Sequence, residues 1–170
     1  MNTDKKIITY HDLPKLSQRL HKGGKTIVFT SGCYDLLHLG HIIHLHYCKS
    51  KGDVLVVNVG NDATVRAVKG PTRPVLNERF RARMVAALAT TDYVVISEES
   101  GKMDHTRFVR LLKPDVYVLN QTDSAIREKR KLIESVGGKL HLCRRLPPGN
   151  LKGGISTTTL KQQLGDEQKM

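Results

Sequence analysis

Two histidines near the start of the chain have the residue type and the spacing to act on a phosphate group. His38 and His41 lie in segment 32–41 (GCYDLLHLGH), which follows a short β-branched run and leads into a segment with helical character. Free N–H groups at a helix start attract anions, and imidazoles there can donate hydrogen bonds to the same anion. Gly40 lets the backbone come close to it. Such donors help most when a phosphate oxygen gains charge in the transition state, so the segment predicts phosphate chemistry without a covalent intermediate.

The same histidines could instead hold a metal ion, because His44 and His46 follow closely. However, His41 and His46 do not share a helical face, and no carboxylate spacing completes a ligand set. A lone His-x-x-His is also more often structural than catalytic. Its setting between a strand, a glycine turn and a helix still favours phosphate binding, and no metal-binding side chains are predicted.

A second candidate anion site lies late in the chain, at 154–158 (GISTT). Hydroxyl groups and free backbone amides at the start of a predicted helix could bind a phosphate there. Taken alone, the segment is better explained as an ordinary helix cap, because serine and threonine are common capping residues.

The basic segment 66–74 (RAVKGPTRP) is predicted to be a loop after the second strand, with Arg79 on the helix that follows. Phosphoryl-type transfer needs positioned positive charge and a divalent metal on the phosphates. A lysine in a loop and an arginine on a helix can supply the positive charge. Solvated surface charge is the alternative. Lys69 is the strongest candidate of this group, and Arg66 and Arg73 are weaker.

Several common enzyme signatures do not occur in the sequence. It contains no G-x-x-x-x-G-K-S/T phosphate loop, no G-x-G-x-x-G fingerprint and no G-x-S-x-G elbow. A kinase, a dehydrogenase and an ordinary esterase are therefore disfavoured.

The elements that must position these residues follow from the apolar pattern. Strands are expected at 25–30, 53–60, 93–96, 116–119 and 139–143, and helices at 39–50, 77–90, 105–112, 124–136 and 157–164. This alternation predicts an α/β fold with a mainly parallel sheet of about five strands and helices on both faces. Ligands in such sheets bind beyond the carboxyl ends of the strands, which places 30–41 and 60–69 at the site.

The helix at 77–90 is expected to begin with Asn77 as its N-cap. Phe80 and Val85 are among the apolar residues that repeat at helical spacing and predict its buried face. Arg79 and Arg83 are expected to lie together on another face.

Length and composition predict one domain. The chain has 170 residues, of which 39% are hydrophobic and 26% charged, enough for one buried core. We expect a single domain over 1–170, with a core at about 6–164 and a short tail at 165–170. No apolar run is long enough to span a membrane and the first residues lack the apolar core of a signal peptide, which predicts a cytoplasmic protein without a membrane partner. The three cysteines, Cys33, Cys48 and Cys143, are expected to be reduced thiols.

The charge balance predicts an anionic partner. Lysine and arginine number 28 against 16 acidic residues, a net charge of +12, which attracts nucleic acid, acidic lipid or phosphorylated metabolites. Only five tyrosines and three phenylalanines are present, tryptophan is absent, and the basic residues are dispersed, so a small phosphorylated ligand is favoured over specific nucleic-acid binding. A non-enzymatic binder of nucleotides or RNA is the alternative from another class.

Five segments together resemble one family: VFTSGCYDLLHLGH (28–41), KGDVLVVNVGNDATV (51–65), VKGPTRPV (68–75), ERFRARMVAALATTDYVV (78–95) and GISTTTL (154–160). In this order they resemble the cytidylyltransferase-like superfamily of nucleotidyltransferases. The residues and their order are most similar to those of the adenylyltransferase domain that activates heptose 1-phosphate. They are more distantly similar to those of glycerol-3-phosphate cytidylyltransferase. The resemblance runs from about Lys6 to Leu164, and the pairing of the two histidines with the late segment is specific.

The resemblance implies a Rossmann-like fold and attack by an acceptor's phosphate on the α-phosphate of an NTP, with release of pyrophosphate and Mg²⁺ bound through the phosphates. It also implies a homodimer or larger assembly. By matching positions, His38, His41 and Lys69 would be catalytic, and Asp35 would shape the site. The residues implied to bind the nucleotide are Ser31, Gly32, Cys33, Tyr34, Gly40, Asn61, Asp62, Arg79, Gly154, Ile155, Ser156, Thr157 and Thr158.

Two departures from the family pattern bear on specificity. The heptose enzymes carry Lys-Gly-Gly-Asp after the fourth strand, where this chain has LNQTD at 119–123; Asn120 and Gln121, with Arg73, are weak candidates for acceptor contacts. The cytidylyltransferases carry an arginine three residues before the glycine of the late segment, where this chain has Leu151, and this favours ATP. An adenylyltransferase for a sugar phosphate such as heptose 1-phosphate is the leading hypothesis. A CTP-dependent cytidylyltransferase for a polyol phosphate, alkyl phosphate or phosphonate is the alternative.

Overall fold

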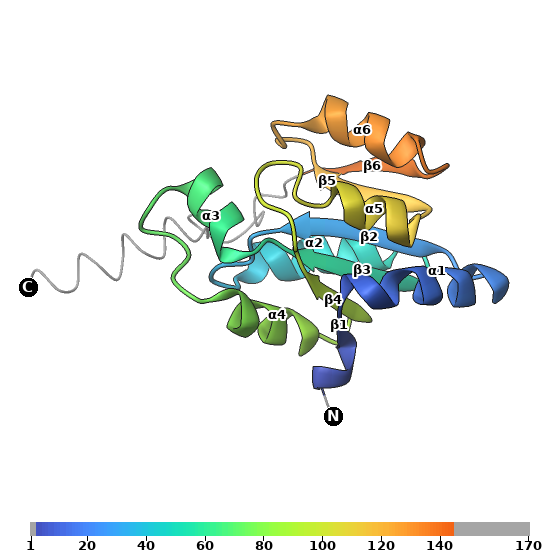
Figure 1. Ribbon diagram of the computed structural model, residues 1–170, viewed down its shortest axis with the longest axis horizontal. Helices are drawn as coiled ribbons and strands as arrows, with labels where there is room; N and C mark the ends of the chain where they lie inside the picture. The colour runs from blue at the N-terminus through green and yellow to red at the C-terminus, as the bar shows by residue number, and fades with distance from the viewer. Residues whose placement is uncertain (1–2, 145–170) are drawn as a thin grey trace, which may run out of the picture.

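The computed structural model describes residues 3–144, which form one six-stranded sheet with helices on both faces (Figure 1). The strands are β1 (Ile7–Ile8), β2 (Ile27–Gly32), β3 (Val54–Val59), β4 (Tyr93–Ile96), β5 (Val116–Asn120) and β6 (Lys139–Cys143). Their order across the sheet is β1-β4-β3-β2-β5-β6, and every pair is parallel. The predicted α/β fold with a parallel sheet is confirmed. The additional strand is β1, whose two residues are too few to give a sequence pattern.

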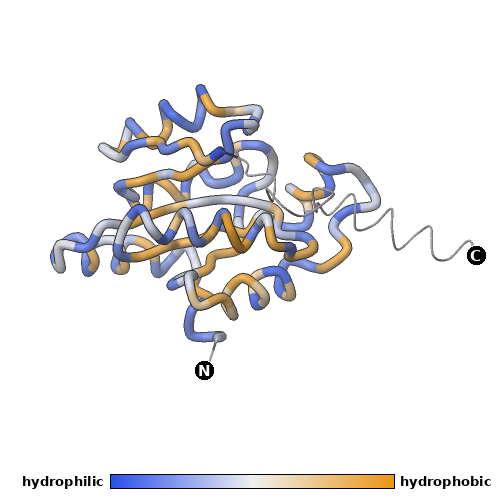
Figure 2. The backbone as a smooth tube through the Cα atoms, turned by 180° about the vertical axis from the view of Figure 1, so that it is seen from behind, coloured by the Kyte–Doolittle hydropathy of each residue, from blue (hydrophilic) through white to orange (hydrophobic). Residues whose placement is uncertain are grey.

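Two apolar clusters, one on each face, hold the helices against the sheet. The helices are α1 (Leu13–Lys22), α2 (Leu39–Lys49), α3 (Asp62–Lys69), α4 (Glu78–Ala86), α5 (Thr106–Leu112) and α6 (Ile126–Glu134). Leucine, valine and aromatic side chains of α1, α5 and α6 share one cluster with Phe29 and Val56, while those of α2 and α4 share the other with Val28 and Val57. Figure 2 shows apolar segments concentrated along the strands and polar segments on the outer turns. Consecutive strand residues supply opposite faces, which explains their nearly continuous apolar runs.

The segment predicted as a basic loop begins inside a helix, so that part of the prediction is wrong. Arg66 and Lys69 belong to α3, and the loop starts at Gly70, whose φ is +100°. Asn61 is the N-cap of this helix and accepts a hydrogen bond from the Thr64 backbone N–H at 2.8 Å. The eight residues of α3 are amphipathic, with Val65 and Val68 at helical spacing. The prediction of a loop rested on the basic residues and on the Gly70-Pro71 pair, and so missed this signal.

The strand order reverses direction at β2, which lies between β3 and β5. The chain moves outward from β2 through β3 to β4 and then crosses back to β5 on the other side. A crevice forms beyond the carboxyl ends of the strands at such a switch point. Within residues 3–144, no helix combines the length and the apolar character needed to cross a membrane.

Candidate functional site

A cavity of about 900 Å³ lies at the carboxyl ends of β2, β3, β5 and β6. Its size and position suit a nucleotide with a small second substrate. It brings together eleven of the residues predicted from the sequence: Ser31, Gly32, Cys33, Tyr34, Asp35, His38, Gly40, His41, Lys69, Arg73 and Asn120. Their roles there stay predictions.

The two histidines lie one above the other at the start of α2. His38 is the N-cap residue, and its carbonyl accepts a hydrogen bond from the His41 backbone N–H at 2.9 Å. The two rings stack with centroids 3.9 Å apart. A Cβ atom on Gly40 would lie 3.0 Å from the His38 ring, so any larger residue here would crowd the imidazole. Two adjacent imidazoles at a helix N-terminus can both donate to one phosphate group.

His44 also lines the cavity, but its Nε2 atom lies between Thr30 Oγ1 at 3.0 Å and Cys48 Sγ at 3.5 Å. The Thr30 hydroxyl donates to the Val118 carbonyl at 3.0 Å, so its oxygen accepts from the His44 Nε2–H, also at 3.0 Å. Burial lowers the pKa of His44 to about 4. Among residues 3–144, no group of three or more histidine, cysteine, aspartate or glutamate side chains is placed to hold a metal ion.

The partly buried His44 is expected to make the protein less stable as the pH falls from about 6.5 toward 4. Above this window the imidazole is neutral in both states; within it, only the unfolded chain takes up the proton, which lowers the free energy of unfolding by about 2 kcal/mol at pH 5. Urea unfolding of wild type and His44→Gln at pH 7 and pH 5 measures this difference. The variant should lose most of the pH-dependent drop, and His46→Gln, an exposed position on the same helix, should keep it. An equal drop in wild type and His44→Gln would contradict the assignment.

Asp35 ties the first loop to the segment before α4. Its carboxylate accepts hydrogen bonds from the backbone N–H groups of Val75 at 2.7 Å and Leu76 at 3.1 Å, and from the Arg73 guanidinium at 2.8 Å. Burial raises the pKa of Asp35, but these hydrogen bonds outweigh it and hold the pKa below its ordinary value. The shaping role of Asp35 stays a prediction. Arg73 lines the cavity while paired with Asp35.

Lys69, the last residue of α3, lies on the cavity wall near Cys33. Burial raises the pKa of the Cys33 thiol, and the positive charges of Lys69 and Arg81 partly offset this effect. The cysteine therefore stays a neutral thiol, and the lysine supplies positive charge opposite the histidine segment.

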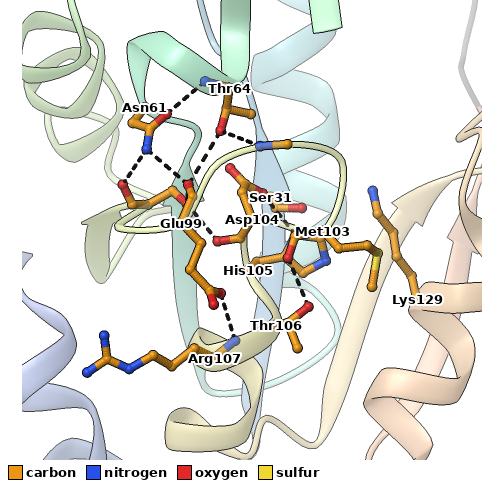
Figure 3. Close-up of polar contacts among 12 residues, drawn as sticks. Ser31, Asn61, Thr64, Glu99, Met103, Asp104, His105, Thr106, Arg107 and Lys129 are labelled. Atoms are coloured by element: carbon orange, nitrogen blue, oxygen red, sulfur yellow. Dashed lines mark hydrogen bonds and ion pairs between the residues drawn. The ribbon is translucent and has the colours of Figure 1, made fainter. Parts of the chain in front are cut away.

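Four of the predicted residues are not among those that line the cavity. Asn61 caps α3 and donates to the carbonyls of Ser97 and Glu99 (Figure 3). Asp62 pairs with Arg81 at 2.7 Å. The other two, Arg79 and Gln121, are exposed. The predicted late segment, 154–158, lies outside the described residues.

Arg81 is a residue that the sequence pattern missed. Its side chain is 0% exposed and donates to Asp62 Oδ1 and to the carbonyls of Leu76 and Cys33. It therefore holds the backbone of the first loop at Cys33. The sequence signal for Arg81 was its position one turn before Val85, on the buried face of α4. Phe80 was predicted on that face, but it is 54% exposed, so that prediction was wrong.

Part of the cavity lining was not predicted. It includes Gly101, Lys102, Asp104 and His105 from the loop before α5, and Thr122, Asp123, Ser124, Ala125 and Lys129 after β5. The Lys129 ammonium binds Asp123 at 2.7 Å, and its side chain is only 9% exposed. The sequence signal was a set of polar residues next to two predicted helix starts.

Comparisons with known proteins agree with the predicted resemblance. A model of the family described as Cytidylyltransferase-like matches residues 29–163. The bifunctional protein HldE of Syntrophotalea carbinolica is 36% identical over 165 residues, which cover 96% of this chain and 32% of that protein. The bifunctional protein HldE of Geobacter metallireducens is 41% identical over 143 residues, 83% of this chain and 28% of that protein. This chain thus spans about a third of the length of these curated relatives.

Two solved structures share the fold. The lipopolysaccharide core biosynthesis protein from Thermoplasma volcanium has a TM-score of 0.61 at 30% identity, covering 71% of this chain and 96% of that one. A pantoate-beta-alanine ligase from Francisella tularensis has a TM-score of 0.61 at 15% identity, covering 91% of this chain and 75% of that one, and shows the fold alone. The predicted family resemblance is confirmed. The chain belongs to the cytidylyltransferase-like family.

Proposed function

We propose that the protein transfers AMP from ATP to a phosphorylated sugar, such as heptose 1-phosphate, and releases pyrophosphate. The observation that carries the proposal is the stacked pair His38 and His41 at the start of α2, on a cavity that Lys69 also lines. The resemblance of the whole chain to the adenylyltransferase domain of heptose 1-phosphate enzymes supports the choice of substrates.

In the proposed reaction, an oxygen of the acceptor phosphate attacks the α-phosphorus of the NTP. A new P–O bond forms as the bond from the α-phosphorus to the α–β bridging oxygen breaks, and pyrophosphate leaves with that electron pair. His38 and His41 donate hydrogen bonds to phosphate oxygens as negative charge builds there, and Lys69 adds positive charge. The chain itself contributes positioning and electrostatic stabilisation.

Mg²⁺ would bind through the NTP phosphates and neutralise part of their charge. The side chains around the histidine pair fit this arrangement, because imidazole and ammonium nitrogens are not the oxygen ligands that Mg²⁺ prefers. Within the described part of the chain, no cluster of acidic side chains competes with the phosphates for the ion.

A pyrophosphate-release screen of four NTPs against phosphorylated sugars, polyols and phosphonates tests the proposal. We expect the highest turnover with ATP and a sugar 1-phosphate. Absence of turnover with ATP would rule out the adenylyltransferase assignment. Salt-sensitive RNA binding without pyrophosphate release from any pair would favour a non-enzymatic binder.

A CTP-dependent cytidylyltransferase is the second candidate. It is favoured by the loop after β5, where Asp123 is held by Lys129 and accepts from the Ala125 backbone N–H at 2.9 Å. This loop departs from the Lys-Gly-Gly-Asp of the heptose enzymes. A larger rise in Tm with CTP than with ATP, at equal concentration, would support this candidate over the first.

A further inference from the structure

A chain of hydrogen bonds links the cavity wall to the loop before α5. The Ser31 hydroxyl lies 2.8 Å from the Tyr117 hydroxyl, which lies 3.0 Å from His105 Nε2. His105 Nδ1 lies 3.1 Å from Asp104 Oδ1. Tyr117, His105 and Asp104 are all buried, and the Phe29 ring packs against both the tyrosine and the histidine. Of the four linked groups, the Ser31 hydroxyl is the most accessible from the cavity.

The chemistry of these groups gives the chain one direction. The Asp104 oxygen accepts from His105 Nδ1–H, and in the tautomer that carries this proton the Nε2 atom is an acceptor. Burial raises the pKa of Tyr117 well above its ordinary value, so the phenol keeps its proton and donates it to Nε2. The Tyr117 oxygen then accepts from the Ser31 O–H. Ser31 therefore presents only oxygen lone pairs to the cavity.

Asp104 supplies a second acceptor on the same wall. Its Oδ2 atom is buried and, among residues 3–144, has no hydrogen-bond partner. It lies beside Gly60 at the end of β3, where an added Cβ would be 3.4 Å away. Both residues line the cavity. Figure 3 shows Asp104 and His105 with Ser31 beneath the loop that leads into α5, and Lys129 across from that loop.

We propose that Ser31 Oγ and Asp104 Oδ2 bind hydroxyl groups of a sugar ring, and that Tyr117 and His105 are positioning residues that hold Ser31 as an acceptor. The neighbouring cationic side chains Lys69 and Lys102 suit phosphates, whereas two acceptors repel phosphate oxygens and suit hydroxyl donors. The ring belongs either to the ribose of the nucleotide or to the acceptor sugar. This inference rests on the proposed function and adds the residues that recognise the hydroxyl groups.

Calorimetric titration without turnover tests the inference by removing one hydroxyl at a time from the ligand. The probes are ATP with 2′-deoxy-ATP and 3′-deoxy-ATP, and mannose 1-phosphate with its monodeoxy derivatives. In wild type, removal of a recognised hydroxyl should weaken binding about tenfold, as for one lost hydrogen bond. The probe series that shows this loss identifies the ring as ribose or acceptor sugar.

Variants then assign the contact. In Ser31→Ala, the hydroxyl and deoxy forms of one ligand position should bind within about twofold of each other, since the acceptor is gone. In Tyr117→Phe, the ratio of the affinities for the hydroxyl and deoxy forms should fall to about threefold, because the Ser31 Oγ–H is then free to rotate toward the cavity. In Asp104→Asn, the difference in affinity between the hydroxyl and deoxy forms should disappear at a second hydroxyl position of the ligand. Tyr93→Phe, which loses a hydroxyl that accepts from Arg19 at the start of β4, is the matched control and should keep the wild-type affinity ratios.

The inference would be overturned if both Ser31→Ala and Tyr117→Phe kept the wild-type ratios of affinity between hydroxyl and deoxy forms. It would also be overturned if every deoxy probe bound the wild-type protein as tightly as its parent ligand. Circular dichroism confirms that each variant is folded. If Tyr117→Phe fails to fold, Ser31→Ala decides, because it removes only the hydroxyl at the cavity end. Failure of the proposed function would be seen separately, as absent pyrophosphate release with intact hydroxyl ratios.

Discussion

Replacing His41 with alanine is expected to lower kcat about 10²-fold or more while the protein keeps its fold. The imidazole is placed at the first turn of α2, stacked on His38 at 3.9 Å, where it can donate to a phosphate oxygen that gains charge in the transition state. Such a contact is stronger in the transition state than in the ground state, so kcat should fall much more than KM rises. Steady-state pyrophosphate release with the best NTP and acceptor pair gives both constants.

His46→Ala is the matched control for this experiment. His46 lies on the same helix and is exposed, so its replacement should leave kcat within about twofold of wild type. Circular dichroism and thermal melting should show both variants folded. A folded His41→Ala protein with near-normal kcat would remove His41 from the catalytic role and leave the helix N-terminus and Lys69 to stabilise the phosphates.

Replacing both histidines should cost less than the product of the two single effects. The rings stack, and removing His38 also removes the packing that holds His41 in place. Residues that act as one unit are not additive in kinetic measurements. The degree of non-additivity therefore measures how far the pair works as one donor group.

Most of the fold could be predicted because the strands carry strong local signals. The observed bounds of β4 and β6 equal the predicted ones, and α2 begins at the predicted residue. β1, α1 and α3 escaped prediction: Ile7 and Ile8 are too short a run, whereas α1 and α3 carry amphipathic patterns that the prediction missed.

The candidate site was predictable only where chemistry and chain position coincide. His38, His41 and Lys69 could be named because glycine turns and strand ends mark such positions, and the structure brings them to one cavity. The hydrogen bonds that orient side chains in the site join residues far apart in sequence. Ser31 and Tyr117 are 86 positions apart, and no local pattern of apolar or polar residues encodes their hydrogen bond.

Arg81→Met is expected to lower the free energy of unfolding by about 3 kcal/mol, the second large effect that the structure predicts. Methionine keeps much of the buried side-chain volume but provides no hydrogen-bond donors. The carbonyls of Cys33 and Leu76 therefore lose their donor, and Asp62 loses its counter-charge. Urea unfolding at pH 7, with an unchanged m-value, measures the loss.

Arg83→Met is the matched control for Arg81, because Arg83 lies on the same helix with a 62% exposed side chain paired to an exposed Asp4. Its replacement should change stability by no more than about 0.5 kcal/mol. The double variant Arg81→Met with Asp62→Asn should recover part of the loss, since the carboxylate no longer lacks a counter-charge. Equal stability of Arg81→Met and Arg83→Met would mean that the buried guanidinium does not hold the first loop. The expected loss, by contrast, would tie the backbone at Cys33, and with it the approach to the histidine pair, to a single charged side chain beneath the site.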